Sequence, residues 1–168
     1  MLKEFNYNEN LEKVLEQIKK GAFLTVKSND KINTMTIGWA SFGIFWNKPI
    51  MVVMVRKSRY TYSLIENVDN FTVSVPIGID LKKELAYCGT YSGRDVDKIK
   101  EMKLNLGKSK KIDAPIIKDC NYHYECKILY SQKMNPEALD KNILSKNYPI
   151  DDYHTFYIGE RLQTYIID

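Results

Sequence analysis

Four side chains that can bind an anion lie close together between residues 56 and 61. Arg56 and Arg59 carry planar guanidinium groups, each of which can bind two oxygens of one phosphate group. Ser58 and Thr61 add hydroxyl donors. Positive charges combined with hydroxyl donors on short side chains are typical of a phosphate site. The alternative is that Ser58 only caps a helix and that both arginines are solvated.

The elements around this cluster would direct it toward a ligand. The apolar run at 50–55 predicts a buried strand immediately before it, and Tyr60, Leu64 and Val68 recur at helical spacing over 60–67. The cluster therefore lies where a strand passes into a helix. The first turn of a helix has unpaired N–H groups and a positive partial charge, so an anion bound there meets both.

The composition is that of an ordinary globular protein. The 168 residues are 44% hydrophobic and 27% charged, which favours one domain over 1–168 with one core. The net charge of +4 is too small to indicate nucleic-acid binding. Residues 1–5 lack the apolar region of a signal peptide, and no stretch approaches the roughly 20 apolar residues of a membrane helix. We therefore expect a cytoplasmic protein with no nucleic-acid or membrane partner.

The cysteines, histidines and lysines offer little further chemistry. Cys88, Cys120 and Cys126 include no CxxC pair, and the chain has only two histidines, so no metal site is expected. Reduced, structural thiols are the favoured interpretation. The lysine-rich run at 108–111 could bind small anions, but a solvated surface is favoured there.

Hydrophobic periodicity predicts many short strands and few helices. In the first half we expect a helix over 9–20, strands over 22–28, 31–41, 50–56 and 70–75, turns at 29–30 and 47–49, and a short helix over 60–67. In the second half we expect helices over 81–88 and 95–103, a strand over 120–130, a short helix opening at Asn135-Pro136, and strands at 153–158 and 161–167 that could be one kinked strand. There is no regular β-α-β alternation and no GxGxxG or Walker loop. The pattern favours a closed antiparallel β architecture with peripheral helices.

The predicted strand at 120–130 has one apolar and one polar face. Its even-numbered positions carry Cys, Tyr and Ile, whereas His123 and Glu125 are among the residues of the other face. We expect the even-numbered face to lie in the core and the polar face to be solvated or at a subunit contact. A catalytic role for His123 is the less favoured alternative.

Four motifs, in this order along the chain, resemble those of one protein family. They are Asn33-Thr34-Met35-Thr36-Ile37-Gly38-Trp39, Arg56 through Thr61, Ser92-Gly93-Arg94-Asp95-Val96-Asp97-Lys98, and His154 followed by Ile158-Gly159-Glu160. Over most of its length the chain resembles the flavin reductase-like proteins, and most closely their flavoredoxin-like branch. The resemblance implies a mainly β fold, a split antiparallel β-barrel of the FMN-binding type with peripheral helices. It also implies a homodimer with FMN near the subunit boundary.

The resemblance further implies which residues hold the cofactor. Residues 33–39 would line the isoalloxazine and ribityl parts of FMN, 56–61 would hold the phosphate, and 92–98 would close the site. The implied FMN-binding residues are Asn33, Thr34, Met35, Thr36, Ile37, Trp39, Arg56, Ser58, Arg59, Tyr60, Thr61, Ser92, Gly93, Arg94 and Lys98. His154 would face the nicotinamide of NADH or NADPH.

Alternation along the first motif separates its side chains into two faces. Thr34 and Thr36 share one face and Met35, Ile37 and Trp39 share the other, so one face can meet the flavin while the other packs inward. From the residues alone, Trp39 could instead be a core aromatic. Likewise, residues 92–95 could be a turn in which Asp95 caps the next helix.

The chain departs from the wider family at one motif. Many reductases of that family carry Gly-Asp-His, a motif associated with nicotinamide nucleotide binding, where this chain has Asp152-Tyr153-His154. The favoured function is an FMN-dependent oxidoreductase that passes electrons from NADH or NADPH to a second flavin or another acceptor. The alternatives are an FMN electron carrier reduced by a protein partner, and a non-catalytic flavin-binding module.

Overall fold

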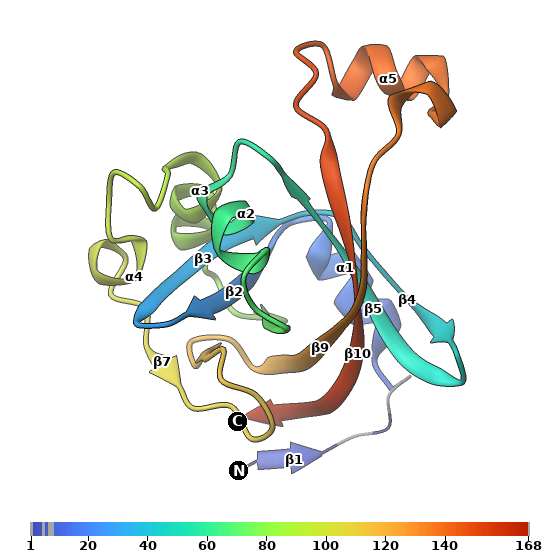
Figure 1. Ribbon diagram of the computed structural model, residues 1–168. Coiled ribbons are helices and arrows are strands. Elements are labelled where there is room, and N and C mark those ends of the chain that lie inside the picture. Colours follow the sequence, from blue (N-terminus) through green and yellow to red (C-terminus); the bar gives the residue numbers. More distant parts are fainter. Residues whose placement is uncertain (1, 5, 7–8, 168) are drawn as a thin grey trace.

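The computed structural model describes residues 2–4, 6 and 9–167. Its first half contains β1 (Leu2–Glu4), α1 (Leu11–Ile18), β2 (Ala22–Ser28), β3 (Lys31–Ile37), β4 (Ala40–Phe45), β5 (Lys48–Arg56), α2 (Tyr60–Ile65) and β6 (Asn70–Val75). Its second half contains α3 (Lys82–Thr90), α4 (Lys98–Glu101), β7 (Leu106–Gly107), β8 (Ile116–Ile117), β9 (Tyr122–Lys133), a 3-10 turn (Pro136–Ala138), α5 (Lys141–Asn147) and β10 (His154–Ile167). Figure 1 shows a twisted sheet with the helices around its margin, and α5 projecting beyond the ends of β9 and β10.

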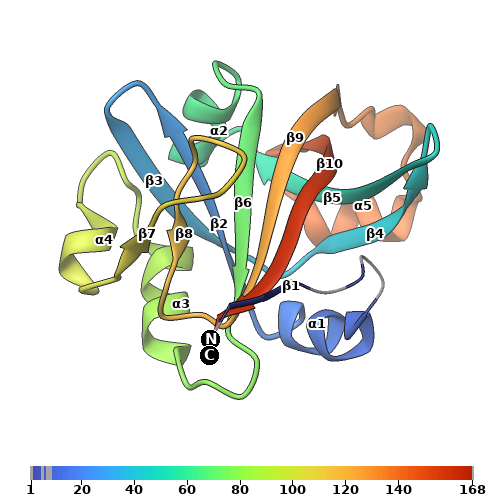
Figure 2. The ribbon, with the colours of Figure 1, turned by 90° about the horizontal axis from the view of Figure 1, so that it is seen from below.

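The described strands form an antiparallel sheet of eight, in the order β3-β2-β6-β9-β10-β5-β4 with β1 paired to β10. Figure 2 shows α3 and α4 on the side of β2 and β3, and α1 and α5 on the side of β4 and β5. The prediction of a mainly β, antiparallel fold with few helices is confirmed. The pairings recorded for the described strands include none between β3 and β4, so they do not show a closed barrel. None of the helices in the described ranges is long and apolar enough to cross a membrane.

One predicted strand is two strands in the structure. Strands 22–28 and 70–75 are confirmed as β2 and β6, but the prediction of one strand over 31–41 is wrong, because the chain leaves β3 after Ile37 and enters β4 at Ala40. β4 then pairs with β5 on the far side of the sheet. The turn expected at 47–49 lies at Trp46 and Asn47, whose φ angles of 51° and 56° are those of a two-residue hairpin turn.

The C-terminal strand is the kinked one that the sequence allowed as an alternative to two strands. β10 runs continuously beside β9, with register shifts between Ile158 and Gly159 and between Arg161 and Gln163. Gly159 lies where two neighbours approach closely, since a Cβ there would come 2.8 Å from both Cys126 Cβ and Phe71 Cζ. The glycine of the fourth motif therefore serves packing.

The core has two parts. The larger one joins the inner faces of α1, β2, β5, β6 and β9, and the smaller one packs Phe23 of β2 against α3 and the segment before β9. The three cysteines are free and buried, as predicted. Burial raises the pKa of the Cys88 thiol to about 11, which suits a structural role.

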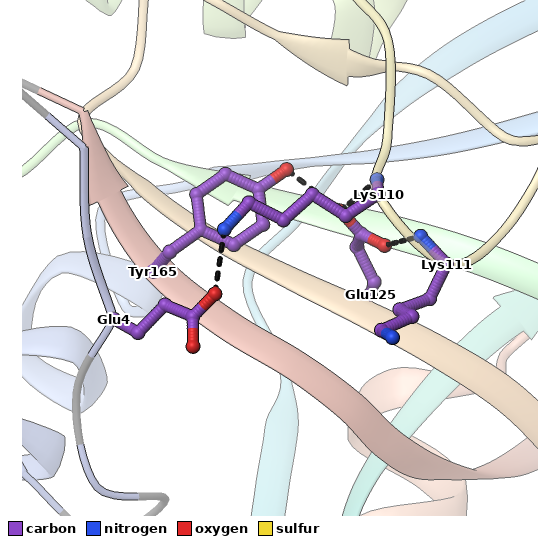
Figure 3. Close-up of polar contacts among 5 residues, drawn as sticks. All are labelled: Glu4, Lys110, Lys111, Glu125 and Tyr165. Carbon is purple, nitrogen blue, oxygen red and sulfur yellow. Dashed lines mark hydrogen bonds and ion pairs between the residues drawn. The ribbon is translucent and has the colours of Figure 1, made fainter.

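The expectation for the polar face of 120–130 is wrong for His123 and Glu125, although Lys127 on the same face is exposed as expected. His123 and Glu125 are fully buried, because the segment before β9 folds over them. The Glu125 carboxylate accepts hydrogen bonds from the backbone N–H groups of Lys110 (2.8 Å) and Lys111 (2.7 Å), and from the Tyr165 hydroxyl (2.7 Å), as Figure 3 shows. Internal donors thus replace the water or the partner subunit that the polar residues suggested.

His123 and Ser74 belong to the same buried polar layer. The His123 Nδ1 lies 3.1 Å from the Ser74 hydroxyl, and burial lowers the pKa of His123 to about 4, so the ring is neutral. Lys110 is exposed, as expected, and its ammonium lies at the edge of this layer, 2.7 Å from Glu4 and over the ring of Tyr165 (Figure 3). The layer is structural and lies outside the four motifs.

Candidate functional site

Three of the four motifs border one pocket. It has a volume of about 180 Å³ and lies between the end of β3, the end of β5 and the start of β10. Its lining consists of Met35, Thr36, Ile37, Gly38, Trp39, Met54, Arg56, Arg59 and His154. Arg56 and His154 are register partners in the β5–β10 pairing, which explains how residues nearly a hundred positions apart come together. The sheet therefore places the first, second and fourth motifs around one space.

The third motif is attached to the first two rather than to the pocket itself. The Arg94 guanidinium donates to the Ser58 carbonyl oxygen at 2.9 Å and lies over the Tyr60 ring. Gly93 lies directly against Asn33, since a Cβ at Gly93 would come 2.1 Å from Asn33 Oδ1. Only glycine fits this contact. These residues border a larger groove of about 830 Å³ beside β3 and α4.

Two cations meet at the end of α3. The Arg59 guanidinium donates to the Gly89 carbonyl oxygen, and the Lys98 ammonium donates to the Cys88 carbonyl oxygen at 3.1 Å. Lys98 is buried, and burial, with Arg59 adding repulsion, lowers its pKa to about 8. No ion pair recorded among the described residues involves either cation. A buried positive charge without a counter-charge is costly, so this pair is suited to an anionic ligand.

Arg56 and Ser58 donate hydrogen bonds to the segment between α5 and β10. Arg56 donates to the carbonyl oxygens of Asp152 (2.7 Å) and Asn147 (3.0 Å). The Ser58 hydroxyl and N–H donate to the two oxygens of the Asp152 carboxylate, at 2.6 and 3.1 Å. An anion at Ser58 would therefore have to replace Asp152.

His154 lines the pocket as a neutral imidazole. It is buried, its Nδ1 lies 2.8 Å from the Tyr148 hydroxyl, and its ring lies 5.3 Å from that of Trp39. Burial, reinforced by Arg56 and Arg59, lowers the pKa of His154 to about 4, although the Asp152 carboxylate acts in the opposite direction. At neutral pH the uncharged ring can donate one hydrogen bond through its N–H and accept one at its other nitrogen.

The arrangement suits an aromatic group attached to a phosphate. Trp39, Met35 and Ile37 offer flat and apolar contacts, and Arg59 and Lys98 offer charge. A family model described as a flavin reductase like domain matches residues 20–168. The chain belongs to the flavin reductase-like family.

Relatives of this flavin reductase-like chain include uncharacterized and flavin-dependent proteins. An uncharacterized protein of Archaeoglobus fulgidus is 36% identical over 107 residues, which is 64% of this chain and 59% of that protein, so this chain spans less than two thirds of that relative. A flavoredoxin from Methanosarcina acetivorans superposes with a TM-score of 0.69 and 26% identity, over 88% of this chain and 68% of the other. An NADH:FAD oxidoreductase from Streptomyces globisporus C-1027 superposes with a TM-score of 0.66, over 96% and 85% of the two chains. At 16% identity, the last likeness concerns the fold alone.

Some residues of the family motifs hold the scaffold together instead of facing the pocket. Asn33 donates its amide to the Thr61 hydroxyl at 2.8 Å, and both side chains are buried. The Thr34 hydroxyl is buried against β2, where it donates to the Leu24 carbonyl oxygen. Thr36, which does line the pocket, donates to the Leu85 carbonyl oxygen of α3. The division of this strand into a flavin face and a core face is therefore incomplete.

Two alternatives for the flavin reductase-like motifs are also resolved. Trp39 is 47% exposed at the rim of the pocket, so it is not a core aromatic. The Ser92 hydroxyl accepts a hydrogen bond from the N–H of Arg94, as in a turn. The helix that follows is capped by Asp97, which accepts from the Lys100 N–H at 3.1 Å, and not by Asp95.

Two residues beside the pocket received no role from their sequence patterns. No periodicity or family motif marks Tyr148, and Asp152 was noted only as part of the departure from the family's Gly-Asp-His motif. The carbonyl oxygens of Cys88 and Gly89 were equally hidden, because any residue type can supply a carbonyl. The pairing of β5 with β10 brings Tyr148 and Asp152 beside Arg56 and Ser58.

Proposed function

We propose that this protein is an FMN-binding oxidoreductase. The observation that supports this best is the pair Arg59 and Lys98, two cations directed at adjacent carbonyl oxygens beside a pocket lined by Trp39 and His154. Proteins similar in structure include a flavoredoxin and an NADH:FAD oxidoreductase. When bound, FMN supplies the electron and hydride transfer, so the protein needs no nucleophile.

The residues present fit this cofactor. Arg59 and Lys98 would hold the phosphate, with Arg94 closing the site through Ser58. Met35, Ile37 and Trp39 would contact the isoalloxazine ring, whose polar edge needs donors and acceptors of the backbone. Arg56, Ser58 and Tyr60 stay part of the proposed site, although Arg56 and Ser58 are hydrogen-bonded to the segment before β10. The other implied residues would hold these side chains in place: Asn33, Thr34, Thr36, Thr61, Ser92 and Gly93.

The proposed electron donor is NADH or NADPH, with His154 facing the nicotinamide. Retention of His154 beside the pocket supports this, while Tyr153 in place of the family's aspartate makes the site bulkier. The second candidate is an FMN electron carrier reduced by a protein partner. The flavoredoxin among the similar structures favours that candidate. A flavin-binding module without catalysis is the third.

We also propose a homodimer that acts in the cytoplasm. The polar residues of β9 no longer support a subunit contact, because His123 and Glu125 are buried within the chain. An apolar surface replaces it: Ile44, Phe45 and Trp46 at the tip of the β4–β5 hairpin are 51%, 47% and 62% exposed. Light scattering tests this directly. A mass near twice the 19.6 kDa of one chain is expected, and a mass near 19.6 kDa at micromolar concentration would contradict it.

The visible spectrum of the purified protein and anaerobic mixing with NADH or NADPH test the proposed function. A yellow preparation that bleaches with either nucleotide supports a reductase, and bleaching only with a reduced protein donor supports the carrier. His154→Ala should slow bleaching by NADH or NADPH while FMN affinity and reduction by dithionite stay nearly unchanged. A protein that binds no flavin under any condition contradicts the proposal as a whole.

A further inference from the structure

Tyr148 and His154 form a buried hydrogen-bonded pair. The Tyr148 oxygen and the His154 Nδ1 are 2.8 Å apart, the two rings are nearly perpendicular, and the residues are only 3% and 8% exposed. In the described part of the chain, each side chain has this contact as its single recorded hydrogen bond. The position of the shared proton therefore decides how the imidazole meets the pocket.

The surroundings of the pair determine which partner donates. Burial raises the pKa of Tyr148 and lowers that of His154, so both groups are neutral at neutral pH. If Nδ1 carried the proton, the buried Tyr148 O–H would have no acceptor among the described residues, and an unpaired buried donor is costly. If Tyr148 donates to Nδ1, both groups are satisfied. The proton of the ring then lies on Nε2.

Arg56 strengthens this direction of donation. Its guanidinium lies 4.9 Å from the centre of the Tyr148 ring and is fixed there by its hydrogen bonds to the carbonyl oxygens of Asn147 and Asp152. A cation over a phenol ring favours loss of electron density from the oxygen, which makes the hydroxyl a better donor. The charged groups that act on His154 are Arg56 and Arg59, which disfavour a second proton on the ring, and Asp152, which favours it.

We infer that Tyr148 is a positioning residue that holds His154 in the Nε2–H tautomer, so that the neutral imidazole donates a hydrogen bond to an acceptor oxygen or nitrogen of the molecule bound in the pocket. His154 lines the pocket and Tyr148 does not, so the edge of the imidazole away from Nδ1 faces the bound molecule. The identity of that molecule as a flavin or its redox partner rests on the proposed function. The assignment of the Nε2–H tautomer to His154 does not depend on the proposed function.

Nitrogen NMR of the two histidines tests this in the protein as purified. The chain has only His123 and His154, so both rings can be assigned and His123 is an internal reference. The expected result at pH 7 is a neutral His154 protonated at Nε2 only. Tyr148→Phe keeps the ring under Arg56 but removes the hydroxyl, and it should shift the His154 signals toward a mixture of both tautomers while His123 stays unchanged.

Two results would overturn the inference. One is a wild-type His154 that is protonated at Nδ1 or carries both protons at pH 7. This result needs only the wild-type protein, so it can be obtained even if the variant fails to fold. The other is a folded Tyr148→Phe protein whose His154 signals match the wild type. Because neither measurement requires flavin or turnover, a failure here is distinguishable from a failure of FMN binding, which the spectrum reports separately.

Discussion

Ser58 gives both of its donors to one carboxylate, that of Asp152. The hydroxyl donates at 2.6 Å and the backbone N–H at 3.1 Å. A carboxylate in this position mimics the anion that the second family motif would bind. If FMN binds as proposed, Asp152 would compete with its phosphate for Ser58, and the negative charge of Asp152 would also repel the phosphate.

Removing that charge should strengthen FMN binding. Asp152→Asn leaves a side chain that can still accept from Ser58, and the loss of one partly screened charge is worth about 0.2 to 1 kcal/mol, so the dissociation constant should fall roughly up to fivefold. Asp151→Asn removes an equal charge one residue away and is the matched control. Weaker binding by Asp152→Asn in fluorescence titrations would instead show that this carboxylate holds the site together.

The arginines and Lys57 should differ in their effects on FMN. Arg59→Ala removes a charge-assisted contact worth about 1.5 to 3 kcal/mol and should weaken FMN ten- to a hundredfold. Arg56→Ala should also weaken FMN more than Lys57→Ala, because Arg56 lines the pocket whereas Lys57 is exposed. Equal losses for Arg59→Ala and Lys57→Ala would mean that only the net charge matters and that the phosphate is held elsewhere.

FMN affinity should depend on the protonation of Lys98. Its pKa is lowered to about 8, so the free protein loses this positive charge as the pH rises through that value, and FMN binding should weaken between about pH 7 and 9. Lys98→Arg keeps a charge at every pH and should flatten this dependence.

The free energy of unfolding should depend on pH in the opposite direction to FMN affinity. Because the unfolded chain holds the lysine proton up to higher pH, this group makes the fold more stable as the pH rises above 8.

Glu125 should matter for stability and not for FMN. Its carboxylate satisfies two N–H groups and one hydroxyl in a fully buried position, so Glu125→Gln should lower the free energy of unfolding by about 1 to 3 kcal/mol. Urea denaturation measures this. Glu137→Gln on the surface is the control and should stay within about 0.5 kcal/mol. A Glu125→Gln protein as stable as the control would show that water can replace these contacts.

Local patterns predicted the elements well where one signal dominated. β2 and β6 match their predicted ranges because apolar runs end at clear turn residues. The separation of β3 from β4 was missed, since Gly38 and Trp39 carry no turn signal strong enough to break an apolar run. The burial of His123 and Glu125 could not be predicted, because alternation shows that two faces differ but not what covers the polar one.

The same limit applies to the site. Residue type and family spacing marked Arg59, Lys98 and His154 as candidates, and the structure places Arg59 and His154 at the pocket and Lys98 at the end of α3. The contacts of Tyr148 and Asp152 were not predicted, because they depend on how the chain between β9 and β10 returns beside β5. Sequence patterns identify groups that can do chemistry, whereas the partners that set their protons and charges come from the fold.

Paired titrations of the flavin-free protein with FMN and with riboflavin test the central claim most directly. The two ligands share the isoalloxazine ring and differ by the phosphate that Arg59 and Lys98 would hold. With one or more charge-assisted contacts of about 1.5 to 3 kcal/mol each, FMN should bind at least ten- to a hundredfold more tightly than riboflavin. Equal affinities for the two ligands would contradict the phosphate site and, with it, the account of this pocket.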